Sequence, residues 1–78
     1  MQYFLGGILL FAGVYIPNEW IECNGQELQI SQYQALFSVI GTTYGGDGMK
    51  TFAVPNLQAP GQGLKYIMCL AGIYPSRG

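Results

Sequence analysis

Histidine is absent from this 78-residue chain, which carries only four acidic and three basic residues. Without histidine, two cysteines alone cannot form a closed zinc site. No serine or cysteine has a candidate general base, and the acidic residues show no spacing typical of a catalytic pair. A net charge of −1 provides no basic stripe to release counterions from nucleic-acid phosphates. These absences predict a protein that is not an enzyme, holds no metal or other cofactor and does not bind nucleic acid.

The scarcity of charge also bears on assembly. Charged residues make up 9% of the chain and hydrophobic residues 50%, whereas an ordinary soluble domain has roughly 25% charged residues. A chain this short buries only about 60 to 65% of the surface that its unfolded form exposes, so one core leaves little stability. We therefore expect a single domain over residues 1–78 that associates with identical subunits. The alternative is a compact monomer with a surface rich in Tyr, Gln, Ser and Thr.

The apolar stretch at residues 3–16 is predicted to be structure rather than a targeting segment. No Lys or Arg precedes it, glycines interrupt it, and it is too short to span a bilayer. We expect no signal peptide and no membrane insertion. As a strand, it would place Ile8 and Leu10 on one face and Leu9 and Phe11 on the other. Both faces would then be apolar, and one of them would need a neighbouring chain as cover.

Short apolar runs bounded by turn residues predict the other strands, at residues 20–23, 26–30, 51–54 and 64–72. Asn24 and Gly25 tolerate positive φ, which predicts a tight hairpin between the first two of these strands. An irregular tail is expected at residues 73–78.

One helix is predicted at residues 32–40, where apolar residues recur with a helical period. Ser31 is the expected N-cap, with Gln34 completing a capping box, and Gly41 is placed to end the helix. The fold class is thus α+β: a small, mostly antiparallel sheet with one short helix. The residues expected in the core are Leu36, Phe37, Ile40, Trp20 and Phe52.

The segment TTYGGDGMK at residues 42–50 is the one place where a phosphate or calcium site is conceivable. No P-loop lysine pattern follows it, and the single carboxylate of Asp47 is far short of the six to eight oxygens that calcium takes. We therefore expect a structural loop in which the glycines adopt positive φ.

Cys23 and Cys69 leave two possibilities open. A disulfide between them would close a long loop and stabilise a small extracellular fold by roughly 2 to 4 kcal/mol. Alternatively, both are buried free thiols, since cysteine is often a small core residue.

Five sequence blocks occur in an order that is similar to one known family. They are YFLGGILLFAG at residues 3–13, P-x-x-W and C-N-G-Q within residues 17–26, ALFSVIGTTYGGDG at 35–48, TFAVPNL at 51–57 and GIYPSRG at 72–78. Together they resemble the bacteriophage tail-collar domain, which also occurs in tail-fibre and microcystin-dependent proteins. The resemblance implies a collar-type α+β fold, other tail components as possible partners, and an extracellular or virion location.

Departures from the family pattern are informative as well. Family members commonly read G-E-I-R where this chain has Gly6-Gly7-Ile8-Leu9, and P-D-L-R-G-R where it has residues 55–60, PNLQAP. Charged positions of the pattern are therefore uncharged here. Longer members also insert a glycine- and threonine-rich region before the closing block, so the chain resembles a shortened collar fold.

Three functions are compatible with these features. The first is a structural subunit that self-assembles into a homo-oligomer, as a filament, tube or phage-tail-associated assembly. The second is a trimeric fibre-tip module that binds a receptor or cell-surface sugar, with Tyr15, Trp20, Tyr44 and Tyr74 as stacking candidates. The third is a small soluble homo-oligomer that sequesters a ligand between subunits.

For self-assembly, the expected contact segments are residues 2–14 and 64–77. The side chains expected at the subunit interface are Tyr3, Phe4, Leu5, Ile8, Leu9, Leu10, Phe11, Leu64, Tyr66, Ile73 and Tyr74. A head-to-tail polymer is favoured over a closed ring, because the uncharged Gly7 and Leu9 allow another subunit to pack there without a charge being desolvated.

Overall fold

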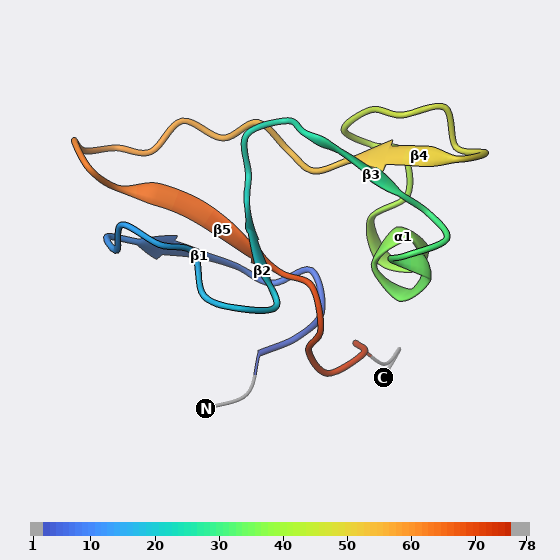
Figure 1. The fold of residues 1–78 in the computed structure, drawn as a ribbon, viewed down its shortest axis with the longest axis horizontal. Coiled ribbons are helices and arrows are strands. Elements are labelled where there is room, and N and C mark those ends of the chain that lie inside the picture. Colours follow the sequence, from blue (N-terminus) through green and yellow to red (C-terminus); the bar gives the residue numbers. More distant parts are fainter. Residues whose placement is uncertain (1–2, 76–78) are drawn as a thin grey trace.

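Two small antiparallel sheets and one short helix form the fold (Figure 1). The structure is a computed structural model, and it describes residues 3–75. The elements in chain order are β1 (Ile8–Phe11), β2 (Trp20–Glu22), β3 (Glu27–Gln29), α1 (Gln34–Ile40), β4 (Thr51–Ala53) and β5 (Lys65–Cys69). The predicted α+β class is confirmed, although each strand is shorter than the sequence suggested.

The first sheet has the order β1-β5-β2, so the last strand of the chain lies between the first two. Both neighbours run antiparallel to β5, and Met68 of β5 lies opposite Ile8 on one side and Ile21 on the other. Valine, isoleucine and aromatic residues favour such strands. Ile67 and Met68 are buried, which is expected for a strand flanked on both edges.

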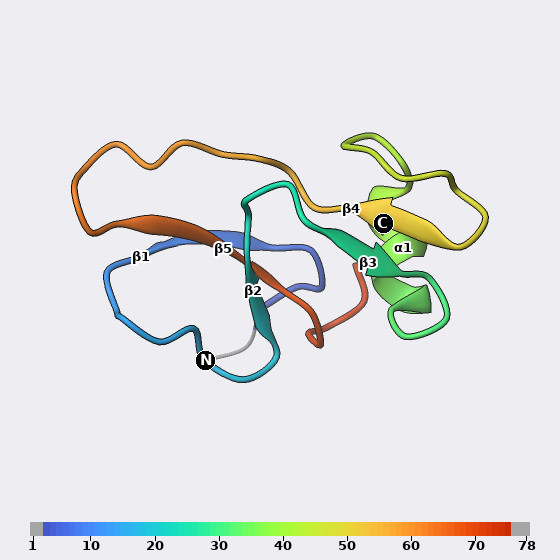
Figure 2. The same ribbon diagram turned by 45° about the horizontal axis from the view of Figure 1, so that its top comes forward.

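The second sheet pairs β3 with β4, and α1 lies beside it in both views of Figures 1 and 2. Leu28 of β3 lies opposite Phe52 of β4. The ring of Phe37 from α1 meets that of Phe52 edge-on, with centroids 5.4 Å apart, a geometry worth about 0.5 to 1.5 kcal/mol beyond area burial.

One hydrophobic core joins the two sheets and the helix. Its buried members are Leu5, Cys23, Leu28, Leu36, Phe52, Val54 and Met68. Leu36 and Phe52 are therefore in the core as predicted, while Phe37 and Ile40 are half-buried against it. The prediction that Trp20 lies in the core is wrong, because Trp20 is outside this cluster. It pairs with Cys69, and side-chain alternation along β5 turns Cys69 away from the face on which Met68 enters the core.

The expected hairpin at Asn24-Gly25 does not form. β2 pairs with β5 and β3 pairs with β4, so the two strands around the turn belong to different sheets. The Asn24 N–H donates to Glu22 O (3.0 Å), which kinks the chain, and the Gly25 N–H donates to Pro55 O (3.2 Å). The chain thus bends after β2 and changes its pairing partner (Figure 1), and of the two residues Gly25 alone adopts the expected positive φ (+84°).

The helix begins two residues later than predicted. Tyr33, with φ −132° and ψ 48°, occupies the N-cap position and makes no side-chain cap hydrogen bond. The predicted cap at Ser31 is wrong because this residue lies in the preceding turn, where the Tyr33 N–H bonds to Ile30 O (3.1 Å). Gly41 ends the helix as expected, with φ +59° and its N–H bonded to Phe37 O (2.8 Å).

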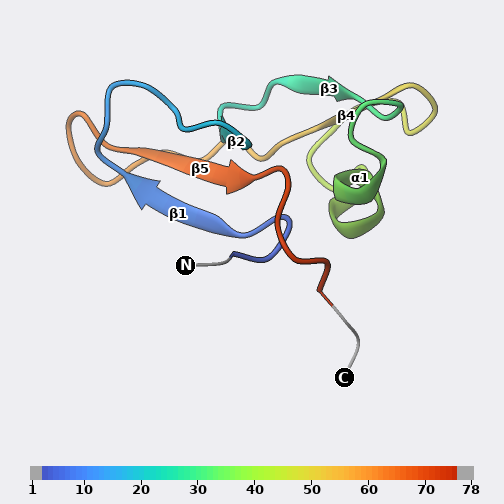
Figure 3. The same cartoon turned by 60° about the horizontal axis from the view of Figure 1, so that its bottom comes forward.

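Backbone hydrogen bonds clasp the two described ends of the chain together. The Leu5 N–H donates to Ile73 O (2.7 Å), and the Ile73 N–H donates to Tyr3 O (2.9 Å). A Cβ at Gly72 would lie 2.2 Å from Tyr3 O, so only glycine fits beside this contact. In Figure 3 the segments entering β1 and leaving β5 lie next to each other, as these bonds require.

The glycine-rich loop at residues 42–50 is organised by a single carboxylate. Asp47 Oδ1 accepts the backbone N–H groups of Met49 (2.8 Å), Lys50 (2.8 Å) and Thr51 (3.0 Å). These bonds, led by that from Thr51, lower the pKa of Asp47 from 3.8 to about 2. The carboxylate is committed to its own loop, which agrees with the structural interpretation of this segment.

We predict that Gly46→Ala severely destabilises the fold. Gly46 has φ +94°, and a Cβ there would lie 2.3 Å from Phe52 Cα and 2.6 Å from Thr51 O. Gly63 has a comparable φ of +78° with no atom within 4 Å, so Gly63→Ala isolates the cost of the backbone conformation. Urea unfolding should show a loss of about 1 kcal/mol for Gly63→Ala and at least about 3 kcal/mol for Gly46→Ala. Equal losses would show that the clash is relieved by a small loop movement.

We also predict that Asp47→Asn makes the free energy of unfolding depend less on pH in the acid range. A carboxyl group whose pKa is lower in the folded than in the unfolded state contributes stability above its unfolded pKa, and this contribution disappears as pH falls through the folded value. The wild-type free energy of unfolding should therefore decline between about pH 4 and pH 2, and Asp47→Asn should decline less. Glu27→Gln, which removes an exposed carboxylate from β3, serves as the control. All variants are measured at the same protein concentration. If the free energy of unfolding of Asp47→Asn falls with pH as steeply as that of Glu27→Gln, the prediction is contradicted.

Candidate functional site

The exposed apolar residues of β1 form the first candidate surface. Ile8 is 43% and Leu10 42% exposed, whereas Leu9 and Phe11 are half-buried. Alternation places Ile8 and Leu10 on the same face of the strand. One apolar row of β1 is thus left partly in water, in agreement with the two-faced character read from the sequence.

The outer edge of β1 has no paired strand among residues 3–75, because β1 is the terminal strand in the order β1-β5-β2. The Cys69 N–H donates to Gly7 O (2.8 Å), which sets the alternation of backbone bonds along the strand. Leu9 and Phe11 therefore bond toward β5, while Ile8 and Leu10 turn their backbone groups outward. The same two residues present both free hydrogen-bonding groups and exposed side chains.

Five of the remaining interface candidates divide into three groups, while Tyr3 and Tyr74 are described below. Phe4 (59% exposed) and Ile73 (44%) form an isolated parallel bridge at the surface. Leu64 and Tyr66 are half-buried. Leu5 is only 5% exposed and belongs to the core, so it is not available as a contact residue. Of the segments expected in the interface, residues 2, 76 and 77 lie outside the described part of the chain.

Tyr74 is exposed but tied to the helix. Its hydroxyl lies 2.7 Å from Ser38 Oγ, which itself donates to Ala35 O (2.6 Å). Because the Ser38 hydroxyl has one proton and gives it to Ala35, the Tyr74 hydroxyl donates to Ser38. The closing segment is thereby fastened to α1 within the same subunit.

The four aromatic residues considered for ligand stacking do not form one site. Tyr15 (87% exposed) lies in the β1–β2 loop, Tyr44 (50%) lies in the glycine-rich loop and Tyr74 (55%) lies in the closing segment. Of the four, Trp20 lines a pocket in the described part of the chain, and its aromatic neighbour there is Tyr3. The sequence offered no local signal for this pair, because Tyr3 is brought to β2 by the hydrogen bonds between residues 3–5 and Ile73.

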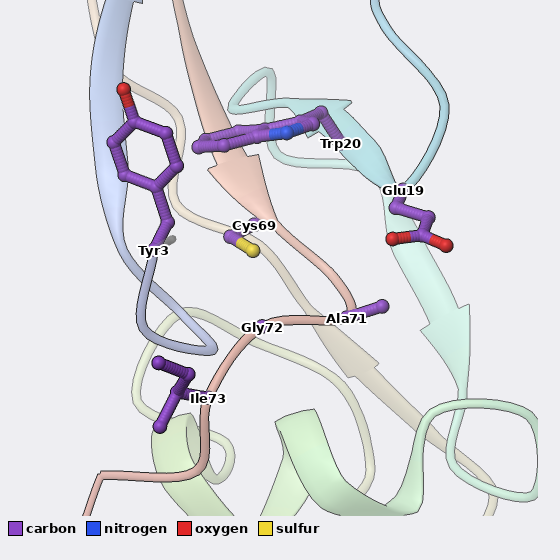
Figure 4. A pocket seen from close by; sticks show the side chains of 7 residues that line it. All are labelled: Tyr3, Glu19, Trp20, Cys69, Ala71, Gly72 and Ile73. Atoms are coloured by element: carbon purple, nitrogen blue, oxygen red, sulfur yellow. The ribbon is translucent and has the colours of Figure 1, made fainter. Parts of the chain in front are cut away.

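The pocket at Trp20 has a volume of about 310 Å³ and opens on the surface (Figure 4). The residues that line it are Tyr3, Glu19, Trp20, Cys69, Ala71, Gly72 and Ile73. The rings of Tyr3 and Trp20 meet edge to face, with centroids 5.0 Å apart and planes at 82°. In Figure 4 the indole is seen edge-on above Cys69, with the Tyr3 ring at one side and the Glu19 carboxylate at the other.

Glu19 has an unusual backbone conformation at the rim of this pocket. Its φ of +69° is the one positive value at a non-glycine residue in the described chain. Glu19 O accepts the Leu70 N–H (2.7 Å), which holds the residue against the segment after β5. Positive φ in a glutamate costs on the order of 1 kcal/mol or more, and the surrounding structure must sustain it.

The two cysteines are free thiols and both are buried. The Cys23 N–H donates to Tyr66 O (2.9 Å), whereas Cys69 lies opposite Trp20, three residues further along the ladder. At about 3.3 Å per residue this offset is about 10 Å, beyond the roughly 7 Å that a disulfide spans. The bridge that the sequence left open is therefore not formed. Burial and the nearby Glu22 raise the pKa of Cys23, which keeps it a thiol.

Within the part of the chain that the structure describes, no three His, Cys, Asp or Glu side chains gather into a possible metal site. In the same region, no helix is both long and apolar enough to cross a membrane.

Comparison with known proteins identifies the family. The family model described as Phage Tail Collar Domain matches residues 6–60, which is more than half of the chain. The matched region contains β1 to β4 and α1 and ends before β5. Among curated proteins, none was similar enough to count as a match. The chain belongs to the phage tail collar domain family, which indicates a structural role in a phage tail and a place in the virion.

Proposed function

We propose that this collar domain is a non-enzymatic building block that self-assembles into a homo-oligomer through β1. The assembly is a tail-associated structure or an extracellular filament or tube, with other tail components as further partners. The observation that carries the proposal is the coincidence, at Ile8 and Leu10, of exposed apolar side chains with an unpaired strand edge.

Backbone pairing supplies the first part of the argument. An unpaired edge presents a row of N–H and C=O groups that a strand of another chain can complete. Proteins that remain monomeric usually protect such an edge with charges, prolines or a bulge. The four residues of β1 are Ile, Leu, Leu and Phe, so the strand contains no charge and no proline.

Side-chain burial supplies the second part. Covering Ile8 and Leu10 removes apolar surface from water, and each Å² is worth about 25 cal/mol. Gly7 and Leu9 stand where family members commonly carry charges, so a subunit that pairs with this strand finds no charge on β1 itself to desolvate. Both terms favour a contact between copies at β1.

The topology of the sheet is compatible with a head-to-tail assembly. β1 and β2 lie at opposite edges and both run antiparallel to β5, so they run parallel to each other. Pairing of β1 with β2 of the next copy would repeat head to tail, giving a polymer where the rotation between copies does not close and a ring where it does. It would also displace two bonds at the outer edge of β2, from the Trp20 N–H to Pro17 O (3.2 Å) and from the Asn24 N–H to Glu22 O (3.0 Å). Pairing of β1 with β1 gives a two-fold dimer instead, and particle mass distinguishes the two arrangements.

The proposal predicts opposite outcomes for proline at two adjacent positions of β1. Leu10→Pro removes an N–H that points outward, which an edge strand tolerates. This variant should stay folded but lose assembly, with the dissociation constant raised at least about tenfold, or about 1.4 kcal/mol. Leu9→Pro removes an N–H that bonds to β5 and should unfold the sheet. Light scattering gives the mass, and circular dichroism reports the fold.

Met49→Glu is the matched surface control for this experiment. Met49 is 85% exposed in the glycine-rich loop, away from β1, so a charge there should leave particle mass unchanged. If folded Leu10→Pro keeps the wild-type mass, β1 is not the contact. If Met49→Glu dissociates the particles while Leu10→Pro does not, the interface lies at the opposite end of the domain.

A further inference from the structure

The pocket beside β2 is separate from the outward edge of β1 and calls for its own account. From its rings and its carboxylate, we infer that this pocket binds an alkylammonium group, such as a quaternary ammonium headgroup or a lysine side chain. The pocket does not use the outer edge of β1, because none of its lining residues belongs to β1. The binding experiment below therefore tests it separately from self-assembly.

The aromatic walls carry the first step. A cation is attracted to the face of an indole ring within about 6 Å of its centroid, and tryptophan is the best of the aromatic side chains for this contact. The indole of Trp20 is half-buried and lines the pocket, and Figure 4 shows it lying across the hollow above Cys69. Tyr3 meets it at 82°, so the two rings bound the pocket as two roughly perpendicular walls.

The charge of the pocket carries the second step. Glu19 is the one lining residue with a formal charge at neutral pH, and no Lys or Arg lines the pocket. Its carboxylate lies across the hollow from Tyr3, on the side of the indole where Cys69 lies (Figure 4). Two rings and one carboxylate around a hollow provide an aromatic contact and a counter-charge for one cation.

The backbone of Glu19 carries the third step. Its positive φ of +69° is held by the bond from the Leu70 N–H to its carbonyl (2.7 Å). Unfavourable backbone conformations cluster at ligand sites, where the surrounding structure fixes them. Here the conformation sets the direction in which the Glu19 side chain leaves the backbone, beside the pocket that it lines.

Size and polarity decide between a cation and a neutral sugar. A pocket of about 310 Å³ accommodates a trimethylammonium group together with part of its alkyl chain. A neutral sugar would also stack on the indole, and one of its hydroxyls would donate a hydrogen bond to the Glu19 carboxylate. Only a cation, however, is attracted both to the ring face and to the negative charge. The carboxylate therefore favours the cationic ligand.

The experiment uses the intrinsic fluorescence of the protein. Trp20 is the single tryptophan of the chain, so its emission reports on this pocket alone. Titration with choline should change the emission and saturate at millimolar concentration, as expected for a few kcal/mol of binding energy. The neutral isostere 3,3-dimethyl-1-butanol should bind at least about fivefold more weakly, since it lacks the charge that Glu19 and the rings attract. Sodium chloride is kept constant throughout.

Two matched variants locate the charge effect. Glu19→Gln keeps the length of the side chain and should weaken choline binding about three- to fivefold, the range expected for an exposed ion pair. Glu27→Gln removes the same charge from β3, away from the pocket, and should bind as wild type does. Circular dichroism checks that both variants are folded.

Each alternative ligand has a distinct outcome. Equal binding of choline and its neutral isostere, or tighter binding of a neutral pyranose, overturns the inference. So does unchanged choline affinity in folded Glu19→Gln. Nα-acetyl-lysine amide distinguishes the sources: binding as tight as that of choline supports a lysine side chain, and weaker binding supports a quaternary headgroup.

Discussion

The pairing of β5 with both β1 and β2 is the constraint on which the rest of the structure depends. β1 and β2 do not pair with each other, so the three-stranded sheet exists only once the end of the chain has returned between them. Ile67 and Met68 are then buried, and the bonds between residues 3–7 and 69–73 follow. Such long-range pairing has a loop-closure entropy cost, which is incurred before the contacts between the strands can stabilise the fold. The family match ends before β5, yet this strand completes the sheet.

Local signals in the sequence predicted the parts of the fold that depend on neighbouring residues. The helical period and Gly41 gave the helix to within two residues at its start, and the glycines of residues 42–50 adopt positive φ as expected. The prediction of a hairpin at Asn24-Gly25 was wrong because the same residue types suit a hairpin turn and a bend that leads the chain into another sheet. An extended segment after Gly25 can pair with the preceding strand or with residues 51–57, and only the distant partner decides.

The candidate surfaces show the same division. Alternation within one strand separated Ile8 and Leu10 from Leu9 and Phe11, but it did not indicate which pair is exposed. The burial of Leu5 was not predictable either, because its bond to Ile73 depends on the chain ends meeting. The pocket also escaped prediction: Tyr3, Trp20 and Gly72 come from three distant segments that β5 brings together. The sequence also left a disulfide open, because the distance between Cys23 and Cys69 is set by the register of β2 against β5. That register is not visible in the sequence.

The free edge of β1 connects stability to assembly. Its inner edge is bonded to β5, and only Leu9 and Phe11 are half-buried, so β1 stabilises the subunit through only part of its surface. A domain of this size has little stability to spare. A copy that binds the outer edge binds only the folded strand, and by mass action it raises the stability of the whole sheet. In the proposed assembly the scarcity of charge has a physical role, because charges on β1 would protect a monomer from association and would prevent the contact that we propose.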